Sequence, residues 1–148
     1  MGQDFEPLRY GKVSSVDLKK GTARIFFEDR DDAVTAELPV LQKNTMTNKF
    51  YWMPQVGETA ACLYATNEQE TGIIIGTIYS EVDTPPTDAK NGKVDGVWYE
   101  DGTVIKYDHT EKTLDIKCTG KMIINVENDL TITAKGKITV TDERGVLL

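Results

Sequence analysis

The side chains best suited to nucleophilic or acid–base chemistry are Cys62, Cys118 and His109, and none stands in a reactive setting. The single histidine lies in a polar stretch, residues 108–112, which indicates a solvated turn rather than a ligand or titrating switch. Cys62 falls inside an apolar strand, and Cys118 takes a position that Val126 and Ala134 take further along the chain. Both cysteines therefore read as small hydrophobic residues without thiolate activation.

Carboxylates are abundant, with 24 Asp and Glu residues, but their arrangement suggests no catalytic site. The acidic run at residues 28–32 could attract a divalent cation, yet its spacing matches no calcium-binding loop, so a solvated loop is the better interpretation. The sequence contains no glycine-rich phosphate loop and no nucleophile paired with a histidine. We therefore expect a protein that is not an enzyme and has no metal site and no cofactor.

Net charge also restricts the partners. Seventeen Lys and Arg against 24 Asp and Glu give −7, which argues against nucleic acid as a partner. Phe50, Tyr51 and Trp52 could stack on bases or sugars, but residues 1–80 hold 8 basic and 11 acidic side chains. A protein contact or a role in closing a barrel is the favoured role of this aromatic loop.

Targeting signals are not evident. The acidic start of the chain predicts no signal peptide, and no apolar run approaches the roughly 20 residues of a membrane span. Two cysteines are too few for a disulfide framework, so a reducing cytoplasm is the expected site of synthesis.

The first half of the chain, residues 1–80, reads as five short strands separated by turns. They are expected at residues 10–16, 22–27, 34–41, 59–65 and 72–79, with little helix. Five strands in about 80 residues are typical of a small closed barrel, with the OB fold as the leading candidate. Residues 81–95 contain adjacent prolines and no periodicity, which predicts a linker. A second domain is expected at 96–148.

An eight-residue repeat dominates that second domain. Alternate residues from 114 to 140 are apolar or small, and they predict a buried column made of Leu114, Ile116, Cys118, Met122, Ile124, Val126, Leu130, Ile132, Ala134, Ile138 and Val140. The intervening slots hold Gly120, Asn128 and Gly136, where a turn with positive φ is expected. A short fixed repeat indicates a stack of similar units rather than a globule.

The apolar side of this stack needs a cover, because a thin isolated sheet is marginally stable in water. Either the first half of the chain or other copies of the repeat supply it. The linker favours copies, and three chains around one axis would bury the whole column. The sequence therefore predicts a homotrimer.

The succession of short motifs resembles the phage baseplate assembly protein V family, the central spike of contractile tails. The motifs that carry the resemblance are Gly11-Lys12-Val13, Ala23-Arg24-Ile25, Leu38-Pro39-Val40, Pro54-Gln55-Val56-Gly57-Glu58, residues 72–76 and residues 96–108, followed by the repeat. The valine-glycine repeat spike of type VI secretion shares the plan. The resemblance implies an all-β homotrimer with an N-terminal OB-fold collar and a C-terminal intertwined triple-stranded β-helix.

Function and partners follow from the same resemblance. It implies a spike that caps the tail tube, nucleates the baseplate and pierces the target cell envelope when the sheath contracts. Hub and tube proteins would bind the collar, in a virion tail or tail-like particle assembled in the bacterial cytoplasm. An OB-fold module that binds carbohydrate or protein, trimerised by the repeat, is the alternative.

Two departures from the family pattern affect the site. About 15 linker residues stand where larger members insert a lysozyme domain, which is too few for an enzyme. The His-x-His motif that binds iron at some spike tips has no counterpart here, since His109 precedes the repeat. Val146, Leu147 and Leu148 would instead form an apolar end that seats a separate PAAR-type tip protein.

Overall fold

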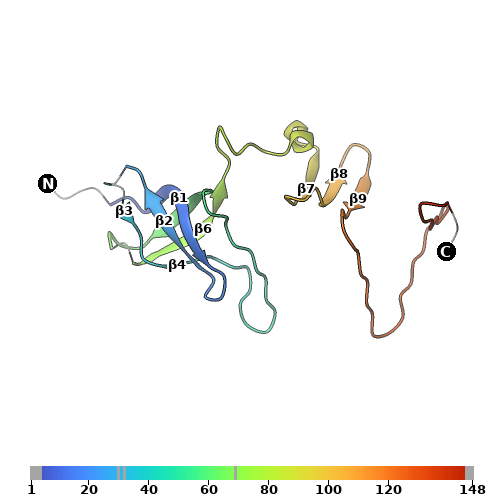
Figure 1. Cartoon of the computed structure of the whole chain (residues 1–148), viewed down its shortest axis with the longest axis horizontal. Helices are drawn as coiled ribbons and strands as arrows, with labels where there is room; N and C mark the ends of the chain where they lie inside the picture. Colours follow the sequence, from blue (N-terminus) through green and yellow to red (C-terminus); the bar gives the residue numbers. More distant parts are fainter. Residues whose placement is uncertain (1–4, 30, 32, 69, 146–148) are drawn as a thin grey trace. The chain divides into compact units, whose positions relative to one another are not determined.

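The computed structural model describes residues 5–29, 31, 33–68 and 70–145 (Figure 1). The chain divides into two compact units, Met1–Lys90 and Asn91–Leu148. Both are built from antiparallel β-sheet, and among the described residues the only helix is a short 3-10 helix, η1 (Thr87–Asn91). The prediction of an all-β protein is therefore confirmed.

The described residues of the first unit form six strands: β1 (Leu8–Asp17), β2 (Thr22–Phe27), β3 (Ala33–Val34), β4 (Leu38–Pro39), β5 (Thr59–Tyr64) and β6 (Gly72–Ile78). Strands β2, β1, β5 and β6 pair in that order, and β4 pairs with β2. Beyond β4, Val40 forms a parallel bridge with Ile74 of β6, and Leu41 N donates to the carbonyl of Ile74 at 2.8 Å. The pairing thus returns from β6 to β4 and joins the strands in a ring.

The core lies inside this ring. Alternation along each strand directs one set of side chains inward, and the buried cluster consists of Val13, Ala23, Ile25, Phe27, Leu38, Val40, Ala60, Cys62, Tyr64 and Ile74. Gly11 is required where β1 lies against β2, since a Cβ there would lie 2.5 Å from Ile25 Cγ2 and 2.6 Å from Phe26 O.

One predicted strand is interrupted. The segment 34–41 was expected to be continuous, but it forms two short strands, β3 and β4, separated by the buried Thr35. Thr35 Oγ1 accepts a hydrogen bond from Ile25 N at 3.0 Å and donates to Ala36 O at 2.7 Å. The side chain takes the place of a backbone partner, so the chain can bend there without leaving Ile25 N unsatisfied.

The second unit begins with a three-stranded meander of β7 (Val94–Trp98), β8 (Val104–Asp108) and β9 (Thr113–Lys117). Strand β7 starts within the segment predicted to be a linker, and η1 also lies there. Gly96 allows β7 to approach β8, because a Cβ at this position would lie 2.6 Å from Ile105 O. After β9, residues 118–140 form none of the named strands.

Candidate functional site: the apolar face of the second unit

One face of the meander is apolar and open to solvent. Ile105 pairs with both Val97 and Ile116, and Tyr107 pairs with Leu114. Directly opposed residues of antiparallel strands point to the same side of a sheet, so these five side chains share one face. All five are exposed in the single chain. The sheet therefore presents a contiguous apolar surface that begins before the repeat.

The residues of the predicted column begin in β9 and run on beyond it in the sequence. Leu114 and Ile116 lie in β9, and Cys118 follows directly and is also exposed. The other described members of the column are exposed as well, and they are Met122, Ile124, Val126, Leu130, Ile132, Ala134, Ile138 and Val140. The single chain brings Leu114 and Ile116 together with the meander and leaves the remaining column residues without a covering layer.

The repeat is visible in the backbone. Bends occur at residues 119–120, 127–128 and 135–136, which are eight residues apart. The stretches between the bends carry the column residues. The spacing of the bends matches the positions expected from the sequence.

The expected backbone conformation at these bends is wrong. Gly120, Asn128 and Gly136 are not among the residues with positive φ. A bend changes the direction of an extended chain without reversing it, so it does not need the left-handed conformation that a two-residue hairpin requires. Gly102, in the turn between β7 and β8, does adopt positive φ, at 85°.

A polar cluster joins this turn to the first bend. Asp101 accepts hydrogen bonds from Thr103 N at 2.8 Å, from Thr103 Oγ1 at 3.1 Å and from Thr119 Oγ1 at 2.9 Å. These bonds lower the pKa of Asp101, that from Thr103 N most strongly. Sequence reasoning missed the cluster, although the Asp101-Gly102 pair is a recognised hairpin signal.

The histidine lies at the opposite end of the meander. His109 Nε2 lies 2.7 Å from Asp95 Oδ2, and its ring meets the ring of Tyr107 edge-on with 5.0 Å between centroids. Its position in a turn after β8 agrees with the sequence interpretation. The contact with Asp95 gives it a structural role that the sequence did not reveal.

Cys62 is buried in the first unit, as expected for a small hydrophobic residue. Burial raises the pKa of its thiol to about 11, against a smaller opposing effect of the Arg9 charge. At neutral pH the group stays protonated, and the thiol is a poor nucleophile.

The aromatic loop divides between two roles. Trp52 and Met53 pack against the buried cluster of the first unit, while Phe50 and Tyr51 are exposed. The expected barrel-closing role therefore applies to Trp52. Phe50 and Tyr51 leave about half or more of their surface open to solvent, at 52% and 64%.

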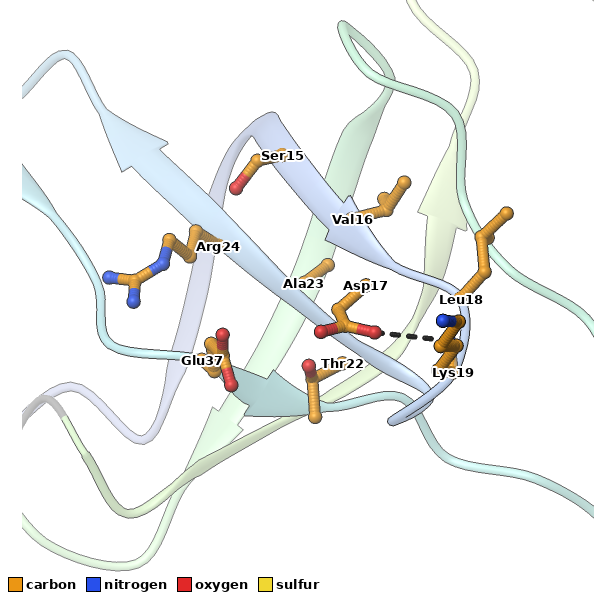
Figure 2. Close-up of a pocket in the computed structure, with 9 residues that line it drawn as sticks. All are labelled: Ser15, Val16, Asp17, Leu18, Lys19, Thr22, Ala23, Arg24 and Glu37. Atoms are coloured by element: carbon orange, nitrogen blue, oxygen red, sulfur yellow. Dashed lines mark hydrogen bonds between the residues drawn. The ribbon is translucent and has the colours of Figure 1, made fainter.

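A pocket of about 430 Å³ lies beside the turn between β1 and β2 (Figure 2). Asp17 and Glu37 both line it. Lys20, which does not line the pocket, places its Nζ 3.7 Å from the Asp17 carboxylate and 2.9 Å from the Glu37 carboxylate. The pKa of Lys20 is raised chiefly by its hydrogen bond to Glu37, and that of Asp17 is lowered chiefly by the amide of Lys20. The acidic groups of the pocket are thus engaged by the turn itself.

No helix within the described ranges is long and apolar enough to cross a membrane. Among those same residues, no three His, Cys, Asp or Glu side chains gather closely enough to hold a metal ion. Val146, Leu147 and Leu148, the predicted tip contact, lie outside the described residues.

No family model matches this chain, and no curated protein matches it.

Proposed function

We propose that this protein is the central spike of a contractile phage tail or phage-tail-like injection particle. The observation that carries the proposal is the exposed apolar face of the second unit, repeated every eight residues together with a bend. The single chain leaves these apolar side chains exposed. A rod built from several copies can bury them.

Three copies would satisfy the pattern most simply. Each chain contributes eleven column residues, and burying a large apolar side chain is worth roughly 1.5–3 kcal/mol before the cost of ordering is subtracted. The intervening positions, such as Lys121, Asp129 and Lys137, would form a charged exterior. An intertwined triple-stranded β-helix is the fold we propose for this part.

The first unit would form the collar of the spike. Its ring β1–β2–β4–β6–β5 has the five-strand count of the OB fold, with β3 as a two-residue addition. The single bridge between Val40 and Ile74 is a weak closure, as expected in a partly open barrel. These features support an OB-fold collar that binds the hub and tube proteins.

The proposed mechanism is mechanical. A narrow trimeric rod with buried alternate residues transmits axial force, and a charged exterior would not insert spontaneously into lipid. Sheath contraction would drive the rod through the target envelope, and the C-terminal end would carry a PAAR-type tip protein.

Removal of the protein from a tail-assembly extract tests this function. Baseplates should fail to form in the depleted extract and should reappear when purified protein is added. Normal baseplate formation without the protein would contradict the proposal and would favour an OB-fold binding module. Efficient leakage of vesicles by the purified protein alone would contradict the force-driven mechanism.

A further inference from the structure

A long excursion between β4 and β5, residues 42–52, forms an ordered arm (Figure 1, teal). The side-chain amide of Gln42 closes its base, because Oε1 accepts from Trp52 N at 3.0 Å and Nε2 donates to Trp52 O at 2.8 Å. Trp52 Nε1 also donates to Leu41 O at 2.8 Å. The side-chain amide of Gln42 thus makes the pair of hydrogen bonds to Trp52 that the backbone of a neighbouring strand would make. These bonds fix the point where the arm leaves the barrel.

Further bonds hold the arm along its length. Phe50 N donates to Asn44 O at 3.0 Å, and Thr45 forms an antiparallel bridge with Lys49. Tyr51 Oη donates to Leu18 O at 3.0 Å and ties the arm to the turn between β1 and β2. An arm ordered in this way loses little conformational entropy when it binds.

The exposed surface of the arm is apolar and aromatic. Met46 is 84% exposed, Phe50 52% and Tyr51 64%. Aromatic residues and methionine are enriched in protein–protein interfaces, where a few such side chains supply most of the binding energy. The arm therefore has the composition of a protein contact.

Its charge differs from that of the rest of the molecule. Between Glu37 and Glu58 the only charged residues are Lys43 and Lys49, and Lys43 Nζ lies 4.8 Å from the centre of the Phe50 ring. Removing these two charges from the net charge of −7 leaves −9 on the remainder of the chain. The arm is complementary to an acidic surface, and two lysines are few for a nucleic-acid backbone, where roughly 6–10 phosphate contacts are common.

We propose that the arm docks on the acidic surface of a neighbouring copy of this chain. The inference rests on the trimer of the proposed function, which would hold acidic copies beside each arm at a high effective concentration. Arm and acceptor are different parts of the chain, so the contact is heterologous, and three such contacts close into a ring. The arms would then join the three collars independently of the apolar column.

Site-specific photo-crosslinking in the full-length protein tests the proposal. A benzophenone amino acid replaces Met46 in one variant and Val82, which is 89% exposed and outside the arm, in a control. Illumination should join copies through position 46 much more efficiently than through position 82. Mass spectrometry of the crosslinked peptides should place the acceptor in an acidic segment of the first unit.

Charge reversal tests the electrostatic basis. Lys43→Glu with Lys49→Glu should lower the crosslinking yield about tenfold, because like charges would then face each other. Lys19→Glu with Lys93→Glu, which changes the net charge equally outside the arm, should leave the yield unchanged. A yield at position 46 that survives reversal at Lys43 and Lys49 would overturn the proposal that the arm docks on an acidic surface.

Sedimentation of the same samples separates the two proposals. A trimer in which position 46 crosslinks no better than position 82 would overturn the arm contact alone. A monomer without crosslinks would overturn both the contact and the trimer. Crosslinks that form only with a different protein of the particle would show that the arm binds that protein rather than a second copy.

Discussion

Asp101 and Thr119 are 18 residues apart, yet the hydroxyl of Thr119 donates to the Asp101 carboxylate at 2.9 Å. Thr103 links the same two residues, because its hydroxyl donates a hydrogen bond to the Asp101 carboxylate and accepts one from Thr119 N at 3.3 Å. The contact fixes the first bend of the repeat against the turn between β7 and β8. The meander thus sets the position from which the repeat begins.

The bend should loosen in acid. The pKa of Asp101 lies below its ordinary value of 3.8, so the ionised form is favoured by folding. Its contribution is fully present above that ordinary value and is lost as the pH falls through the lower, folded value. The protection factors of the amides at residues 118–120, which correct for the pH dependence of intrinsic exchange, should therefore fall below about pH 4. Asp101→Asn should exchange fast at every pH, and an unchanged pH profile in this variant would contradict the role of the carboxylate.

The first unit should not tolerate a side chain at Gly11. Gly11→Ala places a Cβ 2.5 Å from Ile25 Cγ2 and 2.6 Å from a backbone oxygen. The free energy of unfolding should fall by about 1–3 kcal/mol, the usual cost of overpacking a core. Gly76→Ala is the matched control, since a Cβ there meets nothing within 4 Å. Equal denaturation midpoints for the two variants would show that β1 and β2 are not so tightly packed.

Charges in the column should prevent assembly. Ile124→Asp or Ile132→Asp would place three carboxylates around one axis in an apolar interior, at a cost of at least about 3 kcal/mol. Size-exclusion chromatography with light scattering should show loss of the trimer. Thr131→Asp, on the exterior, should leave the trimer intact. Similar behaviour of interior and exterior variants would mean that the assignment of the two faces is wrong.

The alkylation rate of Cys118 should report assembly, with Cys62 as an internal control. With a pKa of about 11, Cys62 is ionised in only about one molecule in a thousand at pH 8 and should resist alkylation in every variant. Cys118 is exposed in the single chain and lies in the predicted column. It should react slowly in the assembled protein and rapidly in Ile124→Asp. Rapid alkylation of Cys118 in the unmutated protein would show that the column is open.

Strand alternation and turn residues were sufficient to predict most of the first unit. The expected strand at 22–27 coincides with β2, and those at 59–65 and 72–79 lie within a residue of β5 and β6. The break at Thr35 was not predictable, because it depends on a hydrogen bond that Ile25 N donates to Thr35 Oγ1. Ile25 lies in β2, ten residues earlier in the chain. Local propensity carries no information about such a contact.

The candidate site shows the same division. Apolar periodicity predicted the positions of the bends, since these depend on the order of residues along the chain, whereas the buried column stays a prediction. Strands β7 and β8 add further apolar residues to the apolar face of the second unit, such as Val97 and Ile105. Their membership of the face depends on the strand register, which the sequence of short exposed strands specifies only weakly. The Asp101 contact depends on side-chain geometry across the meander and was missed for that reason.

Sedimentation equilibrium of the purified full-length protein tests the central claim most directly. We expect one species with three times the chain mass of 16.5 kDa, unchanged on dilution and over a range of salt concentrations. Salt should have little effect because burial of the apolar column, rather than charge, holds the copies together. A stable, folded monomer under the same conditions would contradict it.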